Sequence, residues 1–412
     1  MDAAMVDRLA TGEGWALLQS LPVYDESTAL PLQERLRDAY DADLVAAAMA
    51  QSRLRAKAVD KFGDFAAGML FTADGLEQAT RLPLAARHAH RFASAEVREV
   101  YDLGCGIGAD AMAFASLDLV VRAVDADPVT ARIAAANLRH WPSARVTHAR
   151  ADEVRLPLGE ASRHLGVWLD PARRVSGVAD ARGRTKRVFS LDAISPTWDE
   201  VRGFAADTPA TGAKLSPSFP HAALPEGTEA QWSSWDGEVV ECAIWWGPLA
   251  STPGRTAAVC STAATHVVTE ADAAPAFASP PLTTLAGLGD WLYEPDRAVI
   301  RAGLTPALTA AVDGAELGAR VGYVTSPAAY AIPWAKRYRV VEAMPLSRKA
   351  LSRWLRDRGH DRVTIKKRGV TLDPELLRRQ LKMTGRGRGG SEATLVVTRV
   401  AGTQVVIVVE PA

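Results

Sequence analysis

Apolar and polar positions follow different periods in different parts of this chain. Up to about residue 92 the apolar residues recur at helical spacing, as in the run from Leu44 to Met49, and no alternation of period two interrupts them. We therefore predict an N-terminal helical region over residues 1–92.

From about residue 97, short apolar runs alternate with helical segments. The predicted strands cover 97–103, 119–124, 145–149, 165–169 and 210–215, and the predicted helices cover 110–117, 128–140 and 195–206. Asp127 is a suitable N-cap for the second helix, which begins at Pro128. Repeated βα units predict an α/β fold whose parallel, Rossmann-like sheet is covered on both faces.

The pattern changes after residue 230. Residues 231–235 and 238–246 are strand-like and flank Asp236-Gly237, a strong signal for an antiparallel hairpin. Two further strands are possible at 256–260 and 266–268, and the rest of 250–285 is interpreted as loop. The α/β domain is thus predicted over residues 93–285, followed by a linker or helical connector over 286–334.

The last part of the chain has the order β-α-β-α-β-β. Its predicted strands cover 339–343, 362–367, 392–399 and 403–409, and its predicted helices cover 347–358 and 373–382. This order predicts an α+β sandwich over residues 335–412, with both helices on one face of the sheet.

Length and composition narrow the class of protein. A chain of 412 residues suggests two or three domains. Its formal net charge of zero does not indicate a particular class of binding partner. Its three cysteines form no CxxC pair, so neither a zinc site nor a disulfide framework is predicted. No segment reaches the roughly 20 apolar residues that span a bilayer, and the N-terminus does not resemble a secretory signal. We expect a cytoplasmic protein that binds neither metal nor membrane.

Charge is concentrated near the C-terminus. Residues 336–388 hold seventeen basic and five acidic residues, a net charge of +12 in a neutral chain. Such a segment is typical of proteins that bind nucleic acids, although it is also compatible with a basic domain that covers the α/β domain and binds no nucleic acid. The candidate RNA-binding residues are Lys366, Lys367, Arg368, Arg386 and Arg388.

A glycine-rich loop follows the first predicted strand. Its glycines permit a tight turn and close approach of the backbone to a ligand, and the acidic Asp102 before them suits an ammonium group. Asp125 ends the second strand, 21 residues after the first glycine of the loop, where a carboxylate can accept hydrogen bonds from the ribose hydroxyls. Asp152, after the third strand, is placed to contact the adenine amino group. A dehydrogenase loop also fits the glycine spacing. Three features favour S-adenosylmethionine: an acidic residue before the first glycine, a third glycine that gives GxGxG, and a second motif after the fourth strand. The carboxylates at three successive strand ends argue against a glycine turn that binds no ligand. The candidate cofactor residues here are Asp102, Gly104, Cys105, Gly106, Gly108, Asp125, Ala126 and Asp152.

A second motif, Asp170-Pro171-Ala-Arg173, follows the strand at 165–169, and ligands of open α/β sheets bind at such strand ends. In amino-directed methyltransferases a related motif accepts hydrogens from the target amine and orients its lone pair. Here alanine replaces the second proline and Arg173 replaces the aromatic residue. Enzymes that methylate carbon 5 of uracil also carry this kind of motif, but their nucleophilic cysteine is absent after the fifth strand, and Cys242 is expected to be a buried apolar residue.

Four residues are therefore candidates for catalysis: Asp170, Pro171, Arg173 and Lys214. Arg173 suits either a phosphate contact or an ion pair with Asp170. Lys214, at the end of the fifth strand, suits either a substrate contact or a solvated strand end.

The ordered set of motifs resembles a known family. The segments 102–110, 170–174, 214–217 and 293–296 occur in the order found in bacterial class I methyltransferases that carry a C-terminal THUMP-like domain. Glu77-Gln78-Ala79-Thr80 is similar to the E-Q-[AS]-[ST] element of that family, which adds Glu77 and Gln78 to the candidate cofactor residues. The resemblance implies S-adenosylmethionine dependence, a sheet with an antiparallel C-terminal hairpin and a ferredoxin-like terminal domain. It implies no particular substrate.

These features lead to one main hypothesis and two alternatives. The main hypothesis is a methyltransferase that acts on a base nitrogen of tRNA or rRNA. The alternatives are a methyltransferase for a small molecule or protein, and a non-catalytic RNA-binding protein with a vestigial cofactor fold. The sequence leaves the methyl acceptor, the methylated atom and the oligomeric state open.

Overall fold

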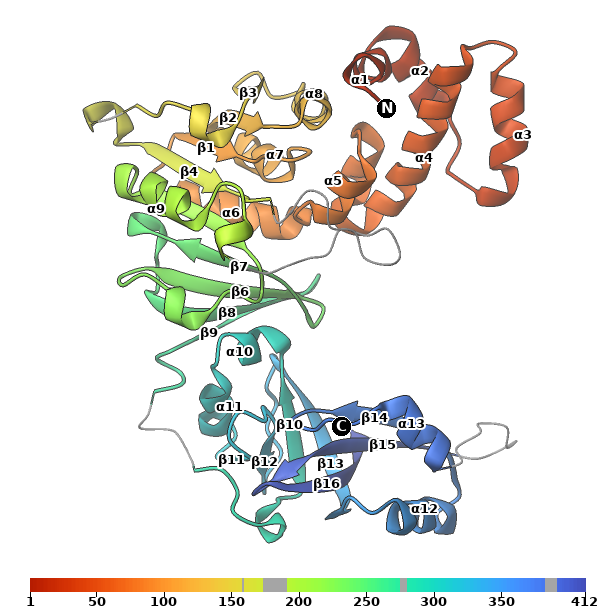
Figure 1. Cartoon of the computed structure of the whole chain (residues 1–412), viewed down its shortest axis with the longest axis vertical. Helices are drawn as coiled ribbons and strands as arrows, with labels where there is room; N and C mark the ends of the chain where they lie inside the picture. Colours follow the sequence, from red (N-terminus) through yellow and green to blue (C-terminus); the bar gives the residue numbers. More distant parts are fainter. Residues whose placement is uncertain (158, 173–190, 275–279, 382–390) are drawn as a thin grey trace. The chain divides into compact units, whose positions relative to one another are not determined.

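A computed structural model of the chain describes residues 1–157, 159–172, 191–274, 280–381 and 391–412 (Figure 1). The chain falls into two compact units. The first comprises residues 1–215 and 244–251, and the second comprises residues 216–243 and 252–412. The four-part division expected from the sequence stays a prediction.

The N-terminal region is helical, as predicted. Its α-helices are α1 (Ala3–Ala10), α2 (Gly12–Ser20), α3 (Glu26–Leu36), α4 (Ala42–Phe62), α5 (Ala73–Gln78) and α6 (Leu82–Ser94). Side chains before several of these helices accept a backbone N–H from the first turn, which satisfies groups that have no partner within the helix. These N-caps are Asp2, Asp25, Asp41 and Thr72.

A nine-stranded sheet follows, in the order β3-β2-β1-β4-β5-β7-β6-β8-β9. Its first five strands are β1 (Glu99–Leu103), β2 (Val120–Asp125), β3 (Ala144–His148), β4 (Leu165–Leu169) and β5 (Ala210–Leu215). They pair in parallel and alternate along the chain with α7 (Ala109–Ser116), α8 (Pro128–Asn137) and α9 (Trp198–Asp207). Every residue of β4 and β5 is buried, which explains the continuous apolar pattern of β4. The α/β sheet is confirmed.

The predicted hairpin forms, but it does not end the sheet. Strands β6 (Glu229–Trp235) and β7 (Glu238–Trp245) are joined by Asp236 and Gly237, whose φ angles of 48° and 85° suit a two-residue turn. Beyond them, β8 (Gly254–Cys260) pairs in parallel with β6, and β9 (Thr265–Thr269) pairs antiparallel with β8. The expectation of a terminal hairpin is corrected in this respect. Six of the seven residues of β6 are buried, so this strand needs a neighbour on each edge.

The C-terminal elements also follow the predicted β-α-β-α-β-β order (Figure 1). They are β13 (Ala335–Pro345), α12 (Arg348–Asp357), β14 (His360–Lys367), α13 (Pro374–Gln380), β15 (Ser391–Val400) and β16 (Thr403–Pro411). Leu351 of α12 and Leu377 of α13 pack into one core with Leu395 and Val397 of β15. Val396, between them, enters a different core on the other face of the sheet. The predicted α+β arrangement is confirmed.

The segment 286–334 differs from the expected connector. It contains the helices α10 (Arg297–Arg301) and α11 (Thr305–Ala311), but also three short strands. These are β10 (Trp291–Pro295), β11 (Ala315–Glu316) and β12 (Val324–Ser326), and they extend the C-terminal sheet to the order β11-β12-β10-β13-β16-β15-β14. Strands of two or three residues, such as β11 and β12, carry too little periodicity to be predicted from the sequence. Their pairing with β13 becomes visible only in the folded chain.

Candidate active site

The glycine loop joins β1 to α7 and depends on its glycines. The φ angles of Gly104, Gly106 and Gly108 are +91°, +56° and +88°, a region that favours glycine. A Cβ atom at Gly104 would lie 2.9 Å from the carbonyl oxygen of Asp170. The loop therefore passes directly against the end of β4.

Asp125 connects the end of β2 to this loop. One of its carboxylate oxygens accepts the backbone N–H of Gly106 at 2.9 Å, and the other accepts that of Asp127 at 2.9 Å. Burial raises the pKa of Asp125, and these two hydrogen bonds oppose that rise. The predicted ribose-binding carboxylate thus lies at the glycine loop, where it also orders the turn.

Asp102 is the most unusual residue of the site. Its side chain is 1% exposed, and neither carboxylate oxygen has a hydrogen-bond partner among the described residues. Burial, reinforced by the nearby carboxylates of Asp110 and Asp170, raises its pKa well above the ordinary range. A buried carboxylate without a partner is costly, so a cationic ligand would be favourable here. The ammonium group of S-adenosylmethionine fits this requirement.

Other predicted cofactor residues lie at the surface. Asp152 is exposed and forms an ion pair with Arg150, whose Nε lies 3.0 Å from its carboxylate. Ala126 is exposed, as are Glu77 and Gln78 at the end of α5. Their assignment to the cofactor site stays a prediction. Cys105, in contrast, is buried within the glycine loop.

Asp170 and Lys214 come together at the ends of β4 and β5. Their carboxylate and ammonium groups are 2.5 Å apart, and the side chains are 29% and 7% exposed. Lys214 is therefore not a solvated strand end. This lysine is a partner of Asp170, and Arg173 lies outside the described residues. Pro171 is buried next to the ion pair.

Three further side chains, which the sequence did not single out, extend the ion pair inward. Lys214 Nζ donates to the Thr80 hydroxyl at 2.9 Å, and this hydroxyl donates to Asp110 at 2.7 Å. The other oxygen of Asp110 lies 2.8 Å from His88 Nδ1. Burial alone would raise the pKa of Asp110, but the contacts with His88 and Lys214 lower it.

Two sequence signals pointed weakly to this extension. Asp110 is the single charged residue in the apolar run from Ala109 to Ala115, so a buried partner for it was to be expected. Thr80 closes the Glu77–Thr80 element. His88 lies on α6 without any distinctive spacing, so nothing in the sequence marked it.

The predicted RNA-binding residues divide into two groups. Lys366 and Arg368 lie 2.7 and 3.4 Å from the carboxylate of Glu294, and Lys367 donates to the carbonyl of Leu372 at 2.5 Å. Lys366 and Arg368 therefore compensate the negative charge of Glu294 within the C-terminal unit. Arg386 and Arg388 lie outside the described residues.

Exposed cations lie instead on and beside α12. This helix packs its apolar face into the core and turns its basic residues to solvent. None of these basic residues forms an ion pair with a carboxylate of the described chain; we call them the α12 cations: Arg348, Lys349, Arg353, Arg356 and Arg358. Arg358 packs over the ring of Trp354 at 4.3 Å.

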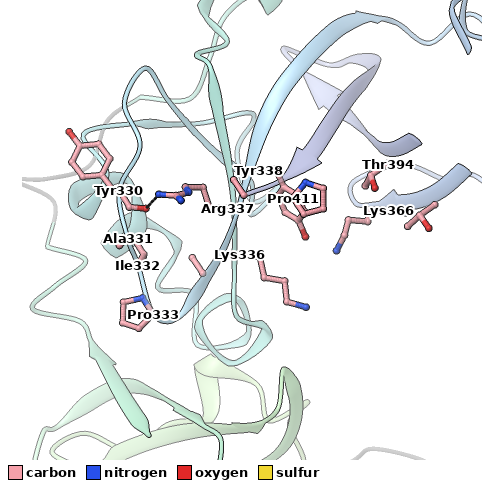
Figure 2. A pocket seen from close by; sticks show the side chains of 13 residues that line it. Tyr330, Ala331, Ile332, Pro333, Lys336, Arg337, Tyr338, Lys366, Thr394 and Pro411 are labelled. Carbon is pink, nitrogen blue, oxygen red and sulfur yellow. Dashed lines mark hydrogen bonds between the residues drawn. The ribbon is translucent and has the colours of Figure 1, made fainter. Parts of the chain in front are cut away.

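A hollow of about 810 Å³ opens on the same unit (Figure 2). Its wall combines aromatic, basic and hydroxyl side chains, and a dashed line in Figure 2 marks Arg337 donating to the Tyr330 carbonyl at 3.3 Å. The polar lining residues are Tyr330, Lys336, Arg337, Tyr338, Thr364, Lys366 and Thr394. The size is within the usual range for small-molecule pockets, roughly 300–1,000 Å³.

Two other features bear on the earlier expectations. Cys242 is fully buried, as predicted, and burial raises the pKa of its thiol well above the ordinary range. Within the described ranges, no group of three or more His, Cys, Asp or Glu is arranged to hold a metal ion. The helices of the described chain include none that is both long and apolar enough to cross a bilayer.

Comparison with known sequences finds two family matches. The family described as THUMP domain-like matches residues 335–411, and a domain of unknown function (DUF8688) matches residues 2–58. Two proteins of Mycobacterium tuberculosis, from the strains CDC 1551 / Oshkosh and ATCC 25618 / H37Rv, are each 29% identical over 359 residues. This similarity covers 84% of this chain and 90% of theirs. Both are named uncharacterized S-adenosylmethionine-dependent methyltransferases, MT3122 and Rv3037c respectively.

A solved structure shares the fold. The crystal structure of a protein from Porphyromonas gingivalis W83, classed as a methyltransferase, has a TM-score of 0.71 at 19% identity and covers 95% of this chain and 100% of its own. The fold, the glycine loop with its buried acidic residue, and the sequence matches agree. The chain is thus an S-adenosylmethionine-dependent methyltransferase whose C-terminal residues 335–411 match the THUMP-like domain.

Proposed function

We propose that this methyltransferase modifies a base nitrogen of RNA, with tRNA or rRNA as the substrate class. The observation that carries the proposal is the position of Asp170. Its carboxylate follows β4, and its own carbonyl oxygen lies against the glycine loop at Gly104. A carboxylate at this place suits an amine acceptor, because it accepts an N–H and leaves the nitrogen lone pair directed at the donor.

S-adenosylmethionine supplies a methyl group on a positively charged sulfur, which is already a good leaving group. The protein therefore contributes binding and orientation more than chemical activation. Asp102 would bind the ammonium group of the cofactor, and Asp125 would bind its ribose. Asp170 would accept an N–H of the target amine and, being 29% exposed, pass the proton that the nitrogen loses to water.

The choice of RNA rests on the C-terminal unit. The α12 cations form an exposed basic face without carboxylate partners in the described chain, which suits a phosphate backbone. Elsewhere on the same unit, Tyr330, Lys336 and Arg337 add aromatic and basic groups at the hollow. The THUMP-like match covers this same region.

Asp170→Asn tests the catalytic part. The asparagine keeps the size of the side chain and an oxygen that can accept an N–H, but it loses the negative charge that stabilises the positive charge developing on the nitrogen, so methyl transfer should fall by about 100-fold. Cofactor affinity, measured by calorimetry, should stay within about threefold, because Asp102 and Asp125 remain. Unchanged transfer by this variant would contradict the role of Asp170.

The substrate is tested with tritiated cofactor and unmodified total RNA, beside protein and small-molecule fractions. Label in RNA, followed by mass spectrometry of the nucleosides, supports the proposal and identifies the atom. Label only in protein or small molecules contradicts the RNA assignment. Tight cofactor binding without label in any fraction favours a non-catalytic protein.

The basic face is tested with the triple variant Lys349→Gln/Arg353→Gln/Arg356→Gln. Loss of three phosphate contacts should weaken RNA binding and reduce the slope of log K against log salt by about 2. The matched control is Arg35→Gln/Arg37→Gln/Arg53→Gln, which removes three exposed basic residues from the N-terminal helices. Equal salt slopes for the two triple variants would remove α12 from the RNA interface.

A further inference from the structure

We infer that Thr80, Asp110 and His88 form a positioning group for methyl transfer: they hold Lys214, and Lys214 holds the Asp170 carboxylate at the reaction site. The inference rests on the proposed role of Asp170. It adds three residues from α6, α7 and the segment between α5 and α6, none of which contacts the reacting atoms.

The hydrogen bonds of the group run in one consistent direction. Lys214 only donates, so the Thr80 hydroxyl accepts from it at 2.9 Å and must direct its own proton to Asp110 at 2.7 Å. Asp110 then accepts from His88 Nδ1 through its second oxygen at 2.8 Å. Lys214 also contacts Asp170 at 2.5 Å. Each charged group thus faces an opposite charge or a matching dipole.

Burial makes this arrangement stiff. Thr80 and Asp110 are each 6% exposed, and His88 is 4% exposed. Hydrogen bonds among such groups are strong, and a missing partner is expensive to leave unpaired. Only the Asp170 end of the group reaches solvent, with 29% of its side chain exposed. A displacement of the inner residues would therefore move the Asp170 carboxylate at the reaction site.

Aromatic contacts support the inner end. The ring of His88 lies 4.5 Å from that of Trp168, which precedes Asp170 by two residues on β4. Trp168 in turn stacks on Trp245 with centroids 5.2 Å apart. The histidine is thus placed by the same strand that presents Asp170.

The group explains the Glu77–Thr80 element, which the proposed cofactor contacts leave without a defined role. Lys61 Nζ donates to the backbone carbonyls of Leu76, Glu77 and Ala79 at 2.7–2.9 Å. These bonds hold the chain directly before Thr80. The hydroxyl of Thr80 is then delivered to Lys214 by a short, fixed segment.

The experiment measures ligand selectivity and needs no RNA. Sinefungin carries a cationic CH–NH₃⁺ group in place of the methyl-bearing sulfur, whereas S-adenosylhomocysteine has a neutral sulfur there. Calorimetry on the full chain gives the ratio of the two dissociation constants. A correctly placed Asp170 carboxylate should favour sinefungin by about tenfold, which is the size of one charge-assisted hydrogen bond.

The variants separate the inference from the proposed function. Asp170→Asn should remove the selectivity. Thr80→Val has nearly the same shape but no hydroxyl, and should reduce the selectivity by about fivefold while S-adenosylhomocysteine still binds. Thr80→Ser restores the hydroxyl and should keep the selectivity within about twofold of the natural protein.

Each outcome decides one question. Equal selectivity in Asp170→Asn and the natural protein overturns the placement of Asp170, and with it the proposed function. Loss in Asp170→Asn but not in Thr80→Val overturns only the positioning group. Loss of S-adenosylhomocysteine binding in Thr80→Val with a native circular-dichroism spectrum also overturns it, since the group would then build the cofactor site. If Thr80→Val does not fold, Asp110→Asn takes its place, with the same two expectations.

Discussion

Two buried carboxylates of the same site differ in pKa because their hydrogen-bond partners differ. Asp102 and Asp110 are 1% and 6% exposed, yet the pKa of Asp102 is raised and that of Asp110 is lowered. Burial acts in the same direction on both. His88, Thr80 and Lys214 compensate it at Asp110, whereas both oxygens of Asp102 have no hydrogen-bond partner among the described residues. Asp110 is thus paired within the protein, and Asp102 is available for a ligand.

Replacing Asp102 by asparagine should stabilise the protein and weaken cofactor binding. A raised pKa means that the folded state binds a proton more tightly, so stability falls as pH rises from about 4 towards the folded pKa. Asp102→Asn removes this penalty. At pH 8 its free energy of unfolding should exceed that of the natural protein by about 1–2 kcal/mol. Cofactor affinity should fall at least about tenfold.

Chemical denaturation at several pH values and calorimetry check this pair of effects. The matched control is Asp207→Asn, which removes an exposed carboxylate and should change neither quantity. A variant at Asp102 that lost stability at pH 8 would contradict the interpretation of an unpaired buried charge.

At the scale of elements, polar side chains fasten the N-terminal helices to the glycine loop. Asn137, at the end of α8, accepts the N–H of Leu70 at 2.7 Å and donates to the carbonyls of Leu70 and Ile107 at 3.0 and 2.9 Å. Gln51 of α4 makes a similar double contact with the backbone of Phe71. The segment before α5 is thus held by side chains and not by a strand.

Asn137→Ala should loosen this junction. It leaves three buried backbone groups without their partner, which costs about 3 kcal/mol of stability. Because Ile107 belongs to the glycine loop, cofactor affinity should fall as well. Ser116→Ala, which removes one hydrogen bond at the exposed end of α7, is the control and should cost less than about 0.5 kcal/mol. Thermal denaturation with and without cofactor measures both effects, and an Asn137 variant as stable as the control would contradict the expectation.

In the C-terminal sheet, Glu294 of β10 also fastens neighbouring segments, because it pairs with Lys366 and Arg368. Burial would raise its pKa, but the hydrogen bond and charge of Lys366, together with Arg368, lower it. The resulting stabilisation is complete above the unfolded pKa of about 4.3 and is lost as pH falls through the lower folded value. Glu294→Gln should therefore destabilise the C-terminal unit by about 2 kcal/mol at pH 7, and much less at pH 3.

Hydrogen exchange of the amides of β10 and β13 reports on this unit separately. The exposed residue Glu410 supplies the control Glu410→Gln, which should leave exchange unchanged. A destabilisation by Glu294→Gln that is equal at pH 3 and pH 7 would show that packing, and not the ion pairs, is responsible.

At the scale of the whole molecule, the two units have separate tasks in the proposed function. The cofactor residues all lie in the first unit, and the α12 cations lie in the second. S-adenosylhomocysteine at 100 times its dissociation constant should stabilise the state that binds it by about 2.7 kcal/mol. Hydrogen exchange should show this protection at the glycine loop and β1–β5, with residues 335–411 unchanged. Equal protection in residues 335–411 would contradict this separation.

The sequence by itself determined the elements whose pattern is local. The glycine loop, the parallel strands and the β-α-β-α-β-β order were predictable because each element carries its own period, cap or turn. The motifs at Asp102 and Asp170 marked the methyl donor in the same way, since the ends of parallel strands meet at one edge of the sheet.

The tertiary structure alone decided which side chains meet. It placed His88 and Thr80 behind Lys214, joined β10 to the C-terminal sheet, and turned Lys366 and Arg368 inward to Glu294. The physical reason is that a charge is satisfied by whichever partner folding brings within about 3 Å, and sequence distance does not determine that partner. The basic C-terminal segment was visible in the sequence, but only the fold separated the charges that pair with Glu294 from the exposed α12 cations.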